Sequence, residues 1–135
     1  MVLAEIIIEA QNIKQKIEQL ESYLDKITVE NTDKIDLATK RLIDLFDKYR
    51  SHLILINTIN NDVKMVVGDS ELSIANTLLI IRTMKRKIDL LNNLIETKDN
   101  FLDVFSLMDQ RDKLLVEYTT ILNKLKHTEW VTNVD

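Results

Sequence analysis

Residues 3–27 read LAEIIIEAQNIKQKIEQLESYLDKI, and this stretch decides the fold. Apolar residues recur in it at alternating intervals of 3 and 4, and most charged residues fall between them. We call such a line of apolar positions a seam. The seam residues here are Leu3, Ile6, Ala10, Ile13, Ile17, Leu20, Leu24 and Ile27. Because this heptad spacing is typical of a helix that packs one face against another helix, we predict a helix over about residues 2–28.

Three later stretches have the same period and predict helices over residues 33–60, 71–97 and 103–127. The second seam comprises Ile35, Ala38, Leu42, Leu45, Tyr49, His52, Ile56 and Ile59, with Leu37, Phe46 and Leu53 expected to broaden the apolar face. The third comprises Ile74, Leu78, Ile81, Met84, Ile88, Leu91 and Ile95. The fourth comprises Val104, Leu107, Leu114, Tyr118, Ile121 and Leu125, with Arg111 at a position where the spacing calls for an apolar residue.

Residues that interrupt helices are scarce, since the chain has no proline and one glycine, Gly68. The asparagine-rich region 57–71 is the one that does not fit a helix, and within it residues 63–67 favour an extended hairpin arm. Ser70 is the predicted N-cap of the third helix and Asp103 that of the fourth. Residues 97–100 predict a turn.

These elements predict an all-α fold in a single domain, 1–135. The architecture we expect is an elongated antiparallel four-helix bundle, or helical hairpins, with a short non-helical segment near 60–70 and a C-terminal tail over 128–135. The tail is expected to fold back on the bundle end or to dock on a neighbouring subunit. Since the apolar faces are wide, we also expect homo-oligomerisation.

The composition argues against several functional classes. Cysteine is absent, and His52 and His127 lack the Glu-x-x-His pattern of a carboxylate-bridged metal site, so we expect neither a metal nor a cofactor. No nucleophile motif or glycine-rich phosphate loop is present, which favours a protein that is not an enzyme. The net charge of −4 argues against duplex nucleic acid as a partner. Apolar runs are too short for a transmembrane segment, and the first residues do not resemble a signal peptide, so the expected location is cytoplasmic.

Four features mark candidate binding residues. Arg82, Lys85 and Arg86 form the densest basic cluster, which is either a solvated face or an anion site. Asn57 and Asn60 add neutral donors and acceptors. Trp130 could close the bundle end or stack on a ligand. His52 is either a hydrogen-bonded core residue that sets helix register or a ligand-binding residue.

Several stretches together resemble the septicolysin family of short helical bacterial and phage proteins. The stretches are Leu3-Ala4-Glu5-Ile6-Ile7-Ile8-Glu9-Ala10, Lys16-Ile17-Glu18-Gln19-Leu20, Ile56-Asn57 with Asn60, Leu72-Ser73-Ile74-Ala75, Lys85-Arg86-Lys87-Ile88, Asp103-Val104 with Leu107, Gln110, Asp112 and Leu114, and Trp130-Val131-Thr132-Asn133-Val134. The resemblance covers nearly the whole chain, although Ile81-Arg82 stands where the family pattern has an Arg-Asp pair. The family name implies a cytolysin.

The functional prediction is therefore a non-catalytic helical homo-oligomer that acts as a binding module. In its most concrete form it sequesters a small anionic, nucleotide-like ligand between subunits. Two alternatives stay open, a membrane-active cytolysin-like oligomer and a protein–protein scaffold.

Overall fold

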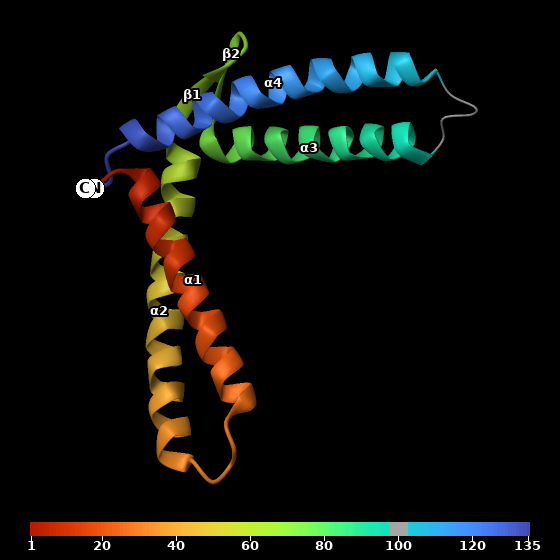
Figure 1. The fold of residues 1–135 in the computed structure, drawn as a ribbon. Helices are drawn as coiled ribbons and strands as arrows, with labels where there is room; N and C mark the ends of the chain where they lie inside the picture. Colours follow the sequence, from red (N-terminus) through yellow and green to blue (C-terminus); the bar gives the residue numbers. More distant parts are fainter. Residues whose placement is uncertain (98–102) are drawn as a thin grey trace. The chain divides into compact units, whose positions relative to one another are not determined.

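Four helices and one two-stranded hairpin make up the described residues, 1–97 and 103–135, of this computed structural model (Figure 1). In chain order they are α1 (Leu3–Lys26), α2 (Thr32–Asp62), β1 (Lys64–Val67), β2 (Ser70–Ser73), α3 (Ile74–Thr97) and α4 (Val104–Val131). The all-α prediction is confirmed. Of the predicted turn, Thr97 is the last residue of α3, and residues 98–100 lie outside the described residues.

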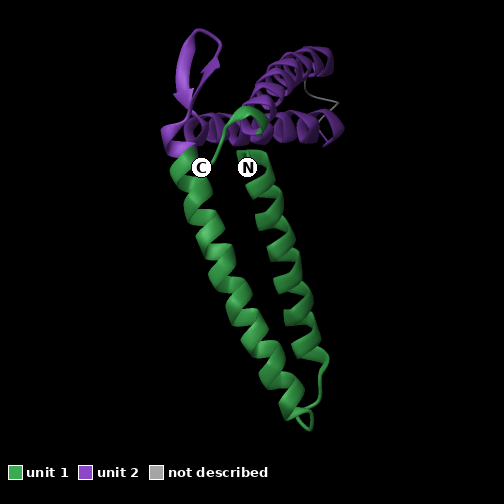
Figure 2. Ribbon diagram, turned by 90° about the vertical axis from the view of Figure 1, so that its left-hand side faces the viewer, with its two compact units in different colours: residues 1–59, 130–135 green, residues 60–129 purple. Residues whose placement is uncertain are grey.

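The chain divides into two compact units (Figure 2). The first unit holds residues 1–59 and 130–135, and the second holds residues 60–129. Within the first unit α1 and α2 run antiparallel as a helical hairpin, as both ribbon views show. Within the second unit α3 and α4 run in opposite directions, and the Arg111 guanidinium Nη1 of α4 donates to Asn92 Oδ1 of α3 at 3.3 Å. The chain predicted as one domain is thus built from two helical hairpins.

The four seams are confirmed, because every seam position is buried or partly buried, whereas the charged residues between them are mostly exposed. The most buried seam residues include Leu3, Ile6 and Ile17 of α1 and Ile74 and Ile88 of α3. Arg111 stands in the fourth seam where the spacing calls for an apolar residue. Its side chain is 24% exposed and forms hydrogen bonds with Asn92 and Asp112. A partly buried guanidinium is tolerated when it is paired in this way.

The expectation that Leu37, Phe46 and Leu53 broaden the buried face of α2 is wrong. Their exposed fractions are 64%, 47% and 43%. Since α1 is the one helix beside α2 in its hairpin, it covers the seam and leaves the flanks of that face in solvent. These three side chains therefore belong to the exposed surface of the first unit.

The segment between α2 and α3 forms the antiparallel pair β1–β2, in which Lys64 pairs with Ser73 and Val67 with Ser70. Gly68 occupies the two-residue turn with φ of 62°, a conformation that glycine adopts at no steric cost. The predicted hairpin arm is confirmed, but α2 extends beyond the predicted end to Asp62. No proline or glycine stops the helix before that point.

Ser70 is not the N-cap of α3, so that prediction is wrong. Ser70 belongs to β2, whose backbone pairs with β1, and helical geometry begins only after Ser73. The Ser73 hydroxyl accepts a hydrogen bond from the Asn76 amide at 3.1 Å and takes the capping role. The predicted cap of α4 is confirmed, because Asp103 Oδ1 accepts from the Ser106 amide at 3.2 Å.

Residues 132–135 fold back against the first residues of the chain. The Leu3 amide donates to the Thr132 carbonyl at 2.9 Å, and the Val134 amide donates to the Met1 carbonyl at 3.0 Å. The tail begins later than predicted, since α4 continues to Val131. Residues 126–131 contain neither glycine nor proline, so nothing ends the helix at 127. The first unit is thus completed by residues from both ends of the sequence.

Candidate binding surfaces

The predicted basic cluster lies on one exposed face of α3. Arg82, Lys85 and Arg86 are exposed, while Ile81 and Met84 of the same helix are buried. Among the described residues, no side-chain hydrogen bond or ion pair involves these three cations. The cluster therefore carries three positive charges within two helical turns, none of them in a direct ion pair, as a solvated face or an anion site would.

The other three predicted binding residues are divided between the units. Asn57 and Trp130 belong to the first unit and Asn60 to the second. Trp130 lies in the last turn of α4 and is 54% exposed. The Asn60 Oδ1 atom is buried and accepts no hydrogen bond within residues 1–97 and 103–135. Asn57 contributes to a groove on α2.

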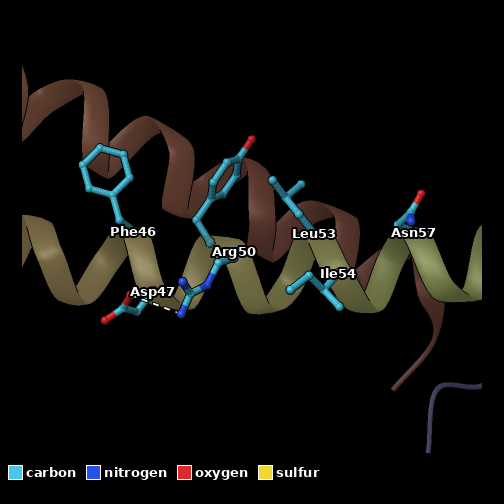
Figure 3. A pocket seen from close by; sticks show the side chains of 7 residues that line it. Phe46, Asp47, Arg50, Leu53, Ile54 and Asn57 are labelled. Atoms are coloured by element: carbon cyan, nitrogen blue, oxygen red, sulfur yellow. Dashed lines mark ion pairs between the residues drawn. The ribbon is translucent and has the colours of Figure 1, made fainter.

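This outer groove lies on the side of α2 that faces solvent (Figure 3). All of its lining residues come from this one helix: Phe46, Asp47, Tyr49, Arg50, Leu53, Ile54 and Asn57. Because one helix supplies every wall, the groove is an open surface. Asp47 and Arg50 form an ion pair across it, with 3.6 Å between Oδ1 and Nη2. Along the helix, Phe46 precedes the ion pair and Leu53 and Ile54 follow it.

A second surface, the inner groove, lies between α1 and α2. Its lining residues are Lys16, Gln19 and Leu20 of α1 and Arg41, Asp44, Leu45 and Lys48 of α2. A neighbouring hollow shares Leu20 and Arg41 and adds Lys34. The two helices thus bring several cations to the inner groove and the neighbouring hollow. Asp44 is the one acid among their lining residues.

Sequence reasoning missed the inner groove. The signal that could have revealed it is the spacing of Lys34, Arg41 and Lys48, which recur every seven residues and so lie on one line beside the seam. The density of positive charge along the sequence instead favours residues 82–87 as the anion site. Cations gathered from two helices leave no such local cluster in the sequence.

His52 connects the two helices of the first unit. Its Nδ1 lies 2.9 Å from the Lys48 carbonyl oxygen, and its Nε2 lies 3.0 Å from Glu9 Oε2. A carboxylate oxygen and a carbonyl oxygen can both accept a hydrogen bond, so the ring donates to whichever partner faces a protonated nitrogen. The side chain is 25% exposed. This geometry agrees with the predicted hydrogen-bonded role that fixes helix register.

Glu129, in the last turns of α4, has an altered acidity. Partial burial removes water from its carboxylate and raises the pKa of Glu129 above the ordinary value of 4.5, while the nearby positive charge of Lys126 opposes the change. This residue was not among the predicted site residues, because its burial follows from the tertiary structure.

Within residues 1–97 and 103–135, no group of three or more histidine, cysteine, aspartate or glutamate side chains is placed to hold a metal ion. None of the helices in this described part is both long and apolar enough to cross a membrane.

Comparisons with known protein families, with curated proteins and with solved structures found no match to this chain. The resemblance to the septicolysin family thus stays a prediction.

Proposed function

We propose that this chain is a non-catalytic, cytoplasmic binding module that associates with copies of itself through exposed helix faces. The observation that carries the proposal is the exposed apolar surface of α2. Ile43, Phe46, Leu53 and Ile54 have exposed fractions of 55%, 47%, 43% and 60% on a helix whose seam already contacts α1.

Large apolar side chains scattered singly on a surface need no explanation, whereas a contiguous group marks an interaction site. These four side chains recur over about three helical turns of α2, and three of them line the outer groove. Burying each in a partner stabilises a complex by up to about 1.5–3 kcal/mol before the cost of association is subtracted. The surface therefore favours binding to another protein chain.

The first experiment measures mass as a function of concentration by sedimentation velocity. We expect the wild-type chain to form a defined oligomer, and the Phe46→Glu/Leu53→Glu variant to be monomeric at the same concentrations with unchanged helical circular dichroism. Leu79→Glu/Leu90→Glu, which alters two exposed residues of α3, is the matched control and should associate as the wild type does. A wild-type monomer at every concentration would refute self-association.

A second candidate function is sequestration of a small anionic, nucleotide-like ligand. The inner groove favours it, because Lys16, Arg41 and Lys48 converge there from two helices. The residues first predicted for this role, Arg82, Lys85, Arg86, Asn57, Asn60 and Trp130, remain a competing proposal for the same ligand class.

Titration with ADP and with pyrophosphate, followed by calorimetry, separates the two anion sites. Binding through the inner groove should be lost in Lys16→Glu/Arg41→Glu and kept in Arg82→Glu/Arg86→Glu. The reverse result would place the ligand on α3. If neither anion binds the wild-type chain at millimolar concentration, this second candidate is refuted, while self-association is unaffected.

A further inference from the structure

The solvent-facing side of α2 carries a ridge of four residues: Ile43, Asp47, Arg50 and Ile54. Their spacing of 4, 3 and 4 places them along one line of a helix. Ile43 and Ile54 are 55% and 60% exposed, and the side chains of Asp47 and Arg50 are 64% and 73% exposed. The ridge lies nearly opposite the seam that faces α1.

The order of these residues is the same in both directions along the helix, with the charge sign exchanged. Outward from the midpoint between Lys48 and Tyr49, the ridge has Asp47 and then Ile43 on one side, and Arg50 and then Ile54 on the other. When a second α2 is turned antiparallel about this midpoint, each position of the ridge faces its mirror position. Each isoleucine then meets an isoleucine and each acid meets a base.

We propose that a second copy of this chain docks on the ridge, so that two α2 helices pack antiparallel about a two-fold axis at the midpoint. This inference rests on the self-association proposed above and names its interface. Asp47 of each copy faces Arg50 of the other, and Ile43 faces Ile54. A two-fold interface must be self-complementary in this way, because the same surface meets itself.

Residues beside the ridge fit the same arrangement. Phe46 and Leu53 both lie on one flank of the ridge, and rotation about the two-fold axis keeps them on that flank. Phe46 of one copy therefore comes beside Leu53 of the other and closes the apolar contact at the edge of the charged pairs. The docking that pairs the charges would thus also remove Phe46 and Leu53 from water.

The charges also select against the parallel arrangement. In parallel register Asp47 would face Asp47 and Arg50 would face Arg50, and both contacts would be repulsive. Within one copy the Asp47–Arg50 pair spans 3.6 Å between highly exposed side chains, so it contributes little stability and can exchange partners. A contact confined to one helix face is a small interface, and we expect a dimer with a dissociation constant in the micromolar range.

Charge reversal on the full chain tests this interface. Asp47→Lys alone places a lysine against Arg50 in both contacts, and Arg50→Glu alone places a glutamate against Asp47 in both contacts. Each variant by itself should dimerise at least about tenfold more weakly than the wild type in sedimentation velocity. An equimolar mixture of the two should restore a dimer that contains one copy of each. In that mixed dimer the lysine introduced at position 47 of one copy faces the glutamate introduced at position 50 of the other, and the unchanged Arg50 faces the unchanged Asp47, so both contacts join opposite charges. One variant carries a fluorophore, so that the mixed dimer is detected directly.

Asp44→Lys and Lys48→Glu are the matched controls. They reverse the same charges on α2 but line the inner groove, and each should dimerise as the wild type does. Circular dichroism reports whether every variant keeps its helices. If the wild-type chain dimerises and the reversed pair shows no preference for the mixed dimer, this interface is refuted while self-association stands. A wild-type chain that stays monomeric refutes both.

Discussion

A hydrogen bond between the side chains of His52 and Glu9 joins α1 to α2 within the first unit. We predict a coupling free energy of about 0.5–1 kcal/mol between the two side chains, because the contact is only partly shielded from water. A double-mutant cycle with Glu9→Ala, His52→Ala and the double variant, each followed by urea unfolding, measures it. Additive single effects would show that the contact does not stabilise the hairpin.

Glu129 gives the protein a pH dependence of known sign. Its pKa is raised in the folded chain mainly by loss of water around the carboxylate, so the folded state holds the proton more tightly than the unfolded state. Below the ordinary value of 4.5 both states are protonated and Glu129 costs nothing. As the pH rises from there through the raised pKa, the free energy of unfolding falls.

We therefore predict that Glu129→Gln raises the melting temperature at neutral pH and leaves it unchanged near pH 3. The increase should be small, because Glu129 is only partly buried. Thermal unfolding at the two pH values checks it. Glu117→Gln, on the exposed surface of the same helix, controls for the loss of one negative charge and should show no comparable gain.

At the scale of elements, the β1–β2 turn depends on a single backbone conformation. A Cβ atom at Gly68 would meet nothing within 4 Å, so Gly68→Ala tests the positive φ alone. We predict a loss of about 1 kcal/mol in the free energy of unfolding, measured with urea. Asp69→Ala, at the neighbouring turn position, should cost less. Equal losses in the two variants would show that the positive φ at residue 68 is not the source of the lost stability.

The interior of each helix could be predicted from the sequence, and so could the Asp103 cap of α4, but the start of α3 and the ends of α2 and α4 could not. Heptad spacing identified every seam residue, because a helix face that packs on another helix must be apolar. The sequence predicts that α3 begins near Glu71, whereas it begins at Ile74, since Ser70 and Ser73 are equally good capping residues in isolation. Pairing of β2 with β1, which is a tertiary contact, decides between them.

At the scale of the whole molecule, the sequence predicted helical hairpins but not the division into two units. Seams show which face of a helix is buried and not which helix covers it. The prediction of binding residues has the same limit, because the sequence does not show which helices lie side by side. Arg82, Lys85 and Arg86 are adjacent in the sequence and share a face, whereas the cations of the inner groove come together only when α1 and α2 pair.

The pairing of residues 132–135 with the first residues of the chain has a consequence for how the protein is made. A ribosome releases the α1–α2 hairpin early, yet the backbone partners of Met1 and Leu3 are synthesised only after all of residues 60–129. The second unit is continuous in sequence and can be complete while the first still lacks its closing residues. During translation the first turn of α1 therefore lacks its backbone hydrogen bonds to residues 132–135. Because these bonds join residues so far apart in the sequence, they form last.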